Sequence, residues 1–390
     1  METGRVLGNP PASCSFAAMD PLFAAPPSSA SAATVPPLRW GILATGRIAG
    51  VFAEGLKSAR AGRLVAVGSR SAESARRFAT EHGIDLAHTH ATYEGLLADP
   101  EVEAVYISTP HPQHAEWVEK AAEAGKHILC EKPLGLNQAE AVAMVGAARR
   151  AGVVLMEAFM YRCHPQTAKI LALIREGALG TVGLVQANFS FRTEYQAESR
   201  LWSNAAGGGG ILDVGCYTVS MSRLVAGAAA GRPFLDPVEV SGAGMLHPES
   251  GVDVYAAATL KFANGVIAQV ASGVGLTLEN VVRIHGSAGW LLVPSPWVIN
   301  REGGASKLIL HRAGAAAPEE IVIEGGPLYA LEADAFARAV RAGAADVPEM
   351  STDDTLGNLA TLDRWRCAIG LTYEAERVVL KSSGPSFPAQ

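Results

Sequence analysis

The sequence lacks three features that would assign it to whole classes of protein: a basic stripe, a long apolar run and closely spaced cysteines. Its formal net charge is -6 over 390 residues and no run of Lys or Arg appears, so the sequence shows no positively charged patch that would bind nucleic acid. No stretch approaches the roughly 20 apolar residues that a membrane-spanning helix needs, because Gly, Arg, Asp or Glu interrupts each long one. We therefore expect neither nucleic acid nor a membrane among its partners.

Cysteine is both scarce and dispersed, and no two cysteines form a CxxC pair. The sequence therefore predicts neither a zinc site nor a dithiol redox site, and no metal is expected. Thiols spaced in this way indicate a reducing compartment, so we expect a cytoplasmic protein. The five residues are Cys14, Cys130, Cys163, Cys216 and Cys367.

Residues 1–37 are rich in Ala, Pro and Ser and hold one basic residue, Arg5. A secretory signal needs a basic start and an unbroken apolar core, which Pro21, Pro26 and Pro27 interrupt here. We expect a disordered extension, with a transit peptide as the alternative. The rest of the chain is long enough for two domains, because one core rarely grows beyond about 250–300 residues.

Between residues 38 and 162, short apolar runs of strand type alternate with helical segments. Such alternation is typical of an α/β domain with a doubly wound parallel sheet. The expected strands cover residues 38–43, 64–68, 102–108, 127–130 and 153–156, and the expected helices cover 72–82, 93–97, 115–124 and 138–151.

The first strand runs into Ala44-Thr45-Gly46-Arg47-Ile48-Ala49, a variant of the GxGxxG dinucleotide fingerprint. Alanine takes the first and third glycine positions, and Gly46 keeps the second. The missing side chain there lets backbone amides approach a pyrophosphate, which the N-terminus of the following helix attracts. We predict that the turn from Ala44 to Ile48 binds the cofactor phosphates.

The second strand ends in Ser69-Arg70-Ser71, where an NAD enzyme usually places a carboxylate on the ribose 2′-hydroxyl. A planar, permanently charged guanidinium at Arg70 suits a 2′-phosphate and also stacks on adenine. Ser69 and Arg70 therefore predict NADP as the cofactor, with NAD left open. In the alternative interpretation, Arg70 only begins the next helix and faces water.

The strand over residues 102–108 is followed by Thr109-Pro110-His111-Pro112-Gln113-His114. Backbone at this place would line the nicotinamide side of the cleft, so we count Thr109, Pro110 and His114 among the cofactor residues. His111 and His114 are candidates for acid–base work. We interpret them instead as histidines at the start of a helix.

The strand over residues 127–130 delivers Glu131-Lys132-Pro133 at its carboxyl end, where an α/β sheet gathers ligand-binding loops. Lys132 is the candidate for chemistry, Glu131 supports the loop on the cofactor side, and Pro133 shapes it. A solvated ion pair at a strand end is the commoner fate of such residues and remains the alternative.

The second half reads as strands in succession, with an Asn264-Gly265 hairpin turn between two of them. Strands without intervening helices predict a large, mostly antiparallel sheet in an α+β domain, which we place at residues 163–350. Residues 351–390 form a last helix to about Glu376, capped by Ser351, which packs back on the first domain and ends in a frayed tail.

Four glycines, 207–210, precede a helix that carries Asp213 and Tyr217. Consecutive glycines suit backbone packed close to cofactor or substrate, and a flexible loop is the alternative. Residues four apart share a helical face, so Asp213 and Tyr217 point the same way.

Glu131-Lys132-Pro133, the preceding Thr109-Pro110 and the later Glu157-Ala158-Phe159-Met160-Tyr161-Arg162-Cys163-His164-Pro165 together resemble the Gfo/Idh/MocA oxidoreductase family. Within it, the chain is most similar to dimeric dihydrodiol dehydrogenases and NADP-dependent xylose dehydrogenases. The resemblance implies a Rossmann domain and a second domain with an open antiparallel sheet, through which two or more copies associate.

The resemblance also places the family's catalytic lysine at Lys132 and its Asp-x-x-x-His/Tyr motif at Asp213 and Tyr217. Two departures stand out. Ala44 replaces a fingerprint glycine, and Tyr217 stands where inositol dehydrogenases have histidine, which argues against inositol as substrate. The residues expected to line the substrate cleft are Arg162, His164, Phe191 and Trp202, with structural roles at the domain junction as the alternative for Arg162 and His164.

Hydride transfer at an alcohol carbon must be matched by proton transfer at its oxygen, and a lysine and a tyrosine can share that proton. We expect Tyr217 or Lys132 to be the acid–base group, Lys132 to polarise the oxygen and Asp213 to orient the substrate. The sequence thus predicts an NADP-dependent oxidoreductase acting on a sugar, polyol or cyclic trans-diol. The alternatives are a sugar-modifying enzyme with retained NAD(P) and a silent sugar or nucleotide sensor.

Overall fold

The structure is a computed structural model that describes residues 36–376. The predicted disordered extension, apart from residues 36 and 37, and the predicted frayed tail from 377 onward lie outside the described residues.

The first domain holds a six-stranded sheet in the order β3-β2-β1-β4-β5-β6, and all of its strand pairs are parallel. The strand order reverses at β1, which lies between β2 and β4, so the predicted doubly wound sheet is confirmed. Its strands are β1 (Leu38–Leu43), β2 (Gly62–Gly68), β3 (Thr89–His90), β4 (Ala104–Ile107), β5 (His127–Glu131) and β6 (Leu155–Ala158). Its helices are α1 (Arg47–Leu56), α2 (Ala72–His82), α3 (Tyr93–Leu97), α4 (His114–Glu123) and α5 (Gln138–Ala151).

The turn from β1 to α1 depends on an unusual backbone conformation at Ala44, whose φ is +87°. An L-residue other than Asn or Asp adopts this region at a cost of about 1–3 kcal/mol. The Ala44 amide donates to the Gly68 carbonyl at 3.0 Å, which ties the turn to the end of β2. Alanine at the first fingerprint position therefore keeps the backbone geometry that glycine adopts without strain.

The second domain holds an eight-stranded sheet in the order β14-β13-β12-β11-β7-β10-β9-β8. Its pairs are antiparallel except β7 with β10, so the prediction of a mostly antiparallel sheet is confirmed. The strands are β7 (Val182–Ser190), β8 (Pro237–Leu246), β9 (Asp253–Phe262), β10 (Ile267–Gly273), β11 (Val282–Gly286), β12 (Gly289–Val293), β13 (Gly304–Arg312) and β14 (Glu319–Gly325).

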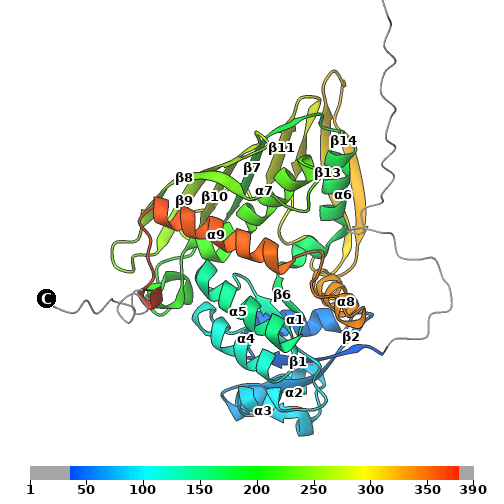
Figure 1. Cartoon of the computed structure of the whole chain (residues 1–390), viewed down its shortest axis with the longest axis vertical. Coiled ribbons are helices and arrows are strands. Elements are labelled where there is room, and N and C mark those ends of the chain that lie inside the picture. Colours follow the sequence, from blue (N-terminus) through cyan, green and yellow to red (C-terminus); the bar gives the residue numbers. More distant parts are fainter. Residues whose placement is uncertain (1–35, 377–390) are drawn as a thin grey trace, which may run out of the picture. The chain divides into compact units, whose positions relative to one another are not determined.

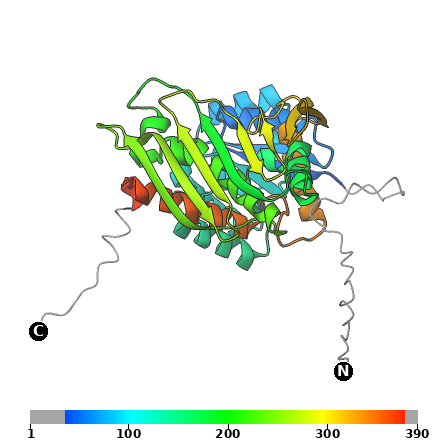
Figure 2. The same ribbon diagram turned by 90° about the horizontal axis from the view of Figure 1, so that it is seen from above.

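Helices α6 (Pro165–Arg175), α7 (Cys216–Ala229) and α9 (Thr352–Ala368) lie on one face of this sheet (Figure 1). The other face is open, and Figure 2 shows the strands with the helices behind them. Burial along β9 follows this arrangement, because Leu260 and Phe262 are buried while Thr259 and Lys261 are exposed.

Helix α9 is shorter than the sequence suggested, because it ends at Ala368 and Gly370 follows with a φ of +73°. It packs against α5, where the Gln138 amide donates to the Asp363 carboxylate at 2.9 Å, and against β8 and α7. Helix α8 (Leu328–Arg341) lies against α1, and the missing side chain of Gly55 leaves room for Tyr329.

Candidate active site

Lys132 is carried to the second domain by the loop after β5. Its Nζ donates to the main-chain oxygen of Asp213 at 2.6 Å and lies 3.9 Å from the Asp213 carboxylate. The Lys132 side chain is 14% exposed and that of Asp213 is 7% exposed, so the contact is largely shielded from water. The structure thus brings together the lysine and the aspartate that the sequence singled out.

Asp213 lies in a π-helical turn, Ile211–Gly215, that leads into α7. Such wide turns are rare and often occur at functional sites. The carbonyl of Asp213 accepts the Lys132 hydrogen bond. The π turn therefore supplies a main-chain acceptor as well as a carboxylate at the same residue.

Tyr217 presents the face of its ring, and not its hydroxyl, to Lys132. The Nζ atom lies 5.1 Å from the ring centroid, a cation–π arrangement. The hydroxyl donates toward the sulfur of Met160 at 3.5 Å. Burial, with the nearby Glu131 carboxylate, raises the pKa of Tyr217 well above its ordinary value.

Asp213 is also paired with Arg200, from the short helix Arg200–Trp202, at 2.9 Å. Burial opposes ionisation of this carboxyl, but the Lys132 and Arg200 cations outweigh burial and hold its pKa below the ordinary value. Asp213 is therefore an anion between two cations. The Arg200 side chain is 53% exposed, so its outer edge faces water.

The glycine run ahead of this turn is required by close packing. A side chain at Gly208 would meet the carbonyl oxygens of Arg200 and Leu201 at 2.6 Å, and one at Gly210 would meet the backbone of Gly273. Gly209 has a φ of +102° and makes room for the Asp253 carboxylate. These contacts favour close packing over a flexible loop as the role of the glycine run. The atoms that pack against these glycines belong to the protein itself.

Asp253 holds the start of the helical segment. It is fully buried, and its carboxylate accepts the Ile211 amide at 2.7 Å. Burial raises the pKa of Asp253 to about 7, although the amides of Ile211 and Gly210 favour the anion. The second carboxylate oxygen has no partner within the described chain.

The loop that carries Lys132 is braced from behind. Glu131 accepts hydrogen bonds from the Tyr106 hydroxyl and from the Lys132 amide. The ring of His114 contacts the carbonyls of Pro133 at 3.0 Å and Thr109 at 2.9 Å, and burial lowers its pKa. His114 thus joins two loops of the cofactor side, and the Lys132–Pro133 peptide bond is cis.

The phosphate-binding turn fits a dinucleotide. The space where a Gly46 side chain would lie is empty, and the N-terminus of α1 has neither a side-chain cap nor an acidic residue in its first turn. Its free amides are available to a pyrophosphate. The Thr45 hydroxyl lies 3.4 Å from that of Ser69, which links this turn to the end of β2.

The residues expected at the adenine and nicotinamide ends lie at strand ends, as predicted. Arg70 is exposed, and its cation lies near the Tyr93 hydroxyl, whose pKa burial raises. Thr109 is buried after β4, and its hydroxyl has no partner among residues 36–376. An unpaired buried hydroxyl at this place suits the sugar of a bound nucleotide.

The four expected substrate residues have other contacts. Arg162 is buried and bonded to Asp354 at 2.6 Å, and His164 is a buried N-cap of α6 that accepts the Gln166 amide. These contacts favour the alternative interpretation, in which Arg162 and His164 have structural roles at the domain junction. Trp202 lies in a small separate core with Val252 and Val274, against which Phe191 packs.

Two residues of the site were not among the sequence candidates. Arg200 lies in a single short helical turn and Asp253 begins a strand far from the motifs, so neither carries a local signal. The glycine run was the one hint, because four consecutive glycines imply that bulky neighbours crowd the backbone. Only the fold shows that Arg200 and Asp253 are two of those neighbours.

Neither a metal site nor a membrane span emerges from the part of the chain that the structure describes. No group of three or more His, Cys, Asp or Glu side chains there is arranged to hold an ion. No helix there is long and apolar enough to cross a membrane.

Comparisons with known proteins match both domains. Residues 38–159 match the profile described as an oxidoreductase family with an NAD-binding Rossmann fold, and residues 167–292 match the GFO/IDH/MocA C-terminal domain. The chain is 30% identical to trans-1,2-dihydrobenzene-1,2-diol dehydrogenase from Mus musculus, over 87% of this chain and 99% of the relative. It is 34% identical to a D-xylose 1-dehydrogenase (NADP(+)) from Haloferax volcanii, over 76% of this chain and 87% of the relative.

A solved structure shows the same architecture. It is a 3-ketoreductase from Actinomadura kijaniata in complex with NADP and TDP-benzene. It is 28% identical to this chain, with a TM-score of 0.76, and the match covers 85% of this chain and 98% of that one.

The buried Asp253 carboxyl predicts a pH-dependent penalty. Its pKa is 3.8 in the ordinary state and about 7 when folded, so its contribution to stability is complete below 3.8 and is lost as pH rises toward 7. Asp253→Asn removes this loss. The unfolding free energy of the variant, relative to wild type, is expected to increase by a few kcal/mol between pH 5 and pH 8.

Urea unfolding at the two pH values measures this change. Asp353→Asn is the control, because Asp353 is 70% exposed and pairs only with Arg149 among the described residues. An Asp253→Asn profile that runs parallel to wild type would contradict a raised pKa.

Proposed function

The chain belongs to the Gfo/Idh/MocA oxidoreductase family, and from that premise we propose that Lys132 handles the proton in hydride transfer between NADP and a sugar-like hydroxyl or carbonyl carbon. The observation that carries the proposal is the Lys132–Asp213 contact, made by a loop of the same parallel sheet that carries the dinucleotide turn after β1. Relatives named as diol and xylose dehydrogenases support a sugar, polyol or cyclic diol as substrate.

Lys132 donates a proton to the carbonyl oxygen in the reductive direction and receives it from the hydroxyl in the oxidative direction. The nicotinamide of a bound cofactor supplies or accepts the hydride. The position of the Tyr217 hydroxyl, which faces Met160, supports Lys132 over Tyr217 as the acid–base group. Tyr217 then stabilises the ammonium through its ring, and Asp213 orients the substrate hydroxyls.

NADP is the cofactor we infer. The uncapped N-terminus of α1 would hold the pyrophosphate, Ser69 and Arg70 would hold the 2′-phosphate, and Thr109 would contact the nicotinamide ribose. No carboxylate stands at the end of β2 to repel a phosphate. The NADP-dependent xylose dehydrogenase and the NADP-bound ketoreductase are consistent with this choice.

Lys132→Met is expected to lower turnover by at least ~100-fold, because it removes the proton donor, while NADPH still binds. Turnover is followed by nicotinamide absorbance with a panel of aldoses and trans-diols, and binding by NADPH fluorescence. Tyr217→Phe removes only a hydroxyl that faces Met160 and should cost much less. Retained turnover in Lys132→Met would contradict the proposal. A loss of turnover in Tyr217→Phe equal to that in Lys132→Met would assign the proton transfer to Tyr217.

Arg70→Ala is expected to reduce the ratio of kcat/KM with NADP to that with NAD by about 10–100-fold, the worth of a charge-assisted contact to phosphate. Steady-state kinetics with both cofactors measure the ratio. Arg76→Ala, an exposed arginine on α2, loses the same charge and should leave the ratio unchanged. If the ratio stays the same in Arg70→Ala, the 2′-phosphate lies elsewhere.

The open face of the second sheet supports a homodimer or higher homo-oligomer as part of the proposal. A row of side chains crosses the face through directly paired residues, and most of them are apolar or aromatic. The row runs Lys261, Ile267, Leu184, His285, Trp290 and His311. Trp290 stacks on His311 at 3.8 Å, and Ile267 is 41% exposed.

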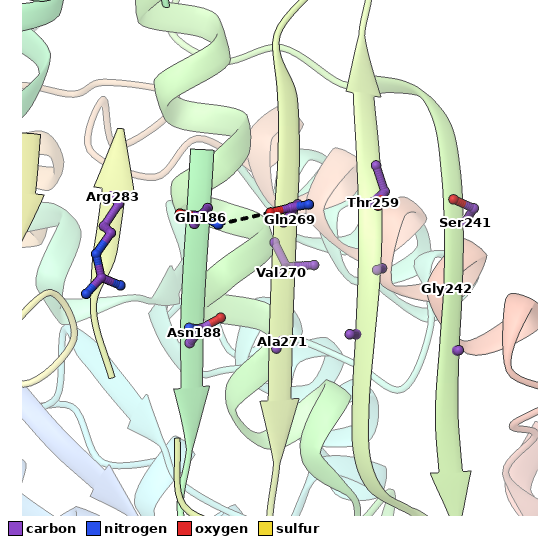
Figure 3. Close-up of a pocket in the computed structure, with 12 residues that line it drawn as sticks. Gln186, Asn188, Ser241, Gly242, Thr259, Gln269, Val270, Ala271 and Arg283 are labelled. Carbon is purple, nitrogen blue, oxygen red and sulfur yellow. Dashed lines mark hydrogen bonds between the residues drawn. The ribbon is translucent and has the colours of Figure 1, made fainter. Parts of the chain in front are cut away.

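Beside this row lies a shallow depression of about 560 Å³, visible in Figure 3. It is lined by small residues such as Ala271 and Gly242, and Gln186 and Gln269 are hydrogen-bonded across it at 3.0 Å. A row of mostly apolar and aromatic side chains beside a polar depression is the composition of a self-associating surface. A second copy of the chain is therefore the proposed occupant.

Ile267→Lys is expected to shift the protein toward monomer, because it places a second cation beside Lys261 in the proposed contact. Ile267 is already exposed, so the protomer should keep its fold. Sedimentation velocity measures the change. Leu86→Lys, at an exposed apolar residue of the first domain, is the control. An unchanged sedimentation coefficient for Ile267→Lys would place the interface elsewhere.

A cytoplasmic location belongs to the same proposal. The four cysteines among the described residues are all free thiols, which suits a reducing compartment. Isolation of the protein from an oxidising compartment would contradict it.

A further inference from the structure

We propose that Arg200 binds an anionic group of the substrate, a carboxylate or a phosphate, so that acidic sugars are preferred over neutral ones. This inference rests on the proposed function and narrows its substrate class. It is carried by the way in which the fold holds Arg200 and by the donors that the fold leaves unused.

The backbone at Arg200 is held firmly. The carbonyls of Arg200 and Leu201 pack against Gly208, where even a methyl group would clash, and Leu201 accepts the Gly209 amide at 2.9 Å. An arginine on a flexible loop would lose more conformational entropy when it bound a ligand. Arg200 is presented on a short helix that is packed against the glycine run.

A small aromatic core supports the same segment from the other side. Trp202 is 4% exposed and donates through its ring nitrogen to the Thr193 hydroxyl at 3.1 Å. Tyr195 stacks on His247 at 4.1 Å, and Trp202 lies edge-on to both rings. These aromatic residues form a platform for the segment, and this platform fixes the origin of the Arg200 side chain.

The guanidinium points at the reaction centre with most of its donors unengaged. Its Nη1 bonds the Asp213 carboxylate at 2.9 Å, and no other side-chain hydrogen bond of Arg200 occurs within the described residues. A guanidinium has five N–H donors, and the Arg200 side chain is 53% exposed. A ligand bound near Lys132 therefore meets a fixed, partly free guanidinium.

Asp213 has a second cation beside it. The Lys132 ammonium already lies 3.9 Å from its carboxylate. The other titratable groups facing this place offer no second free anion, because Glu131 accepts from Tyr106 and from its own loop. His111, buried nearby, has a pKa lowered to about 3 and stays neutral. A neutral sugar would leave the outer edge of Arg200 to water.

An acidic substituent matches this edge in chemistry and geometry. Carboxylate and phosphate oxygens accept two parallel N–H bonds from a guanidinium, a contact that lysine cannot reproduce. Charge-assisted hydrogen bonds contribute about 1.5–3 kcal/mol, which corresponds to a 10–100-fold preference. The source of the anion, a sugar acid or a sugar phosphate, is decided by the ligands compared.

The experiment compares D-glucose, D-glucuronate and D-glucose 6-phosphate on wild type, Arg200→Gln, Arg200→Lys and the control Arg192→Gln. Arg192 lies in the same loop, is 63% exposed and pairs with Glu194. The first readout is kcat/KM with NADP. The second is calorimetric binding of each ligand to the NADP-loaded protein, which reports on Arg200 even when no turnover occurs.

Wild type and Arg192→Gln are expected to favour at least one acidic ligand over D-glucose by 10–100-fold. Arg200→Gln should lose that preference, and Arg200→Lys should keep only part of it. Equal binding of neutral and acidic ligands by wild type, or an equal loss for both in Arg200→Gln, would overturn the inference. Absence of turnover with retained acid-selective binding would instead count against the proposed function alone.

Discussion

The hydrogen bond from the Lys132 ammonium to the Asp213 carbonyl is the contact on which the site depends, because it joins two domains at residues 81 positions apart in the chain. On one side, the loop after β5 must place a cation at the edge of a parallel sheet. On the other, the π turn Ile211–Gly215 must present the Asp213 carbonyl to that cation. Residues behind each side support this bond. Glu131 and His114 hold the loop that carries Lys132, and Asp253 holds the start of the segment that carries Asp213.

Much of the fold and the centre of the site were accessible from the sequence, because both are written in local patterns. Alternating apolar runs and helices predict the parallel sheet, and a strand ending in Glu131-Lys132-Pro133 predicts a reactive lysine at its edge. The spacing of Asp213 and Tyr217 predicts a shared face. What it does not predict is that the Tyr217 ring, rather than its hydroxyl, approaches Lys132. That orientation depends on where Met160 lies, and Met160 arrives from a different domain.

The expected substrate residues also show that local sequence does not determine which side chains reach the cleft. Arg162 was expected to line the cleft, with a structural role at the domain junction as the alternative. In the fold it forms a buried network with Asp354, to which Arg223 also bonds, and Arg223 is fully buried. A buried pair of this kind adds little stability over apolar packing, yet loss of one partner is costly. Its place between α9, α7 and the end of the first domain explains why α9 returns across both domains.

Arg200 and Arg162 differ in how far the surrounding residues satisfy the donors of their guanidinium groups. Arg162 is surrounded by acceptors that satisfy its guanidinium, so its charge is stabilised by groups within the fold. Around Arg200, the glycine run and the Trp202 platform fix the backbone but supply no acceptor beyond Asp213. Polar groups that a fold buries are ordinarily hydrogen-bonded within it, as those of Arg162 are, whereas the half-exposed Arg200 side chain keeps free donors toward solvent. Rigid backbone combined with unused donors is therefore the pattern of a residue whose partner is the ligand.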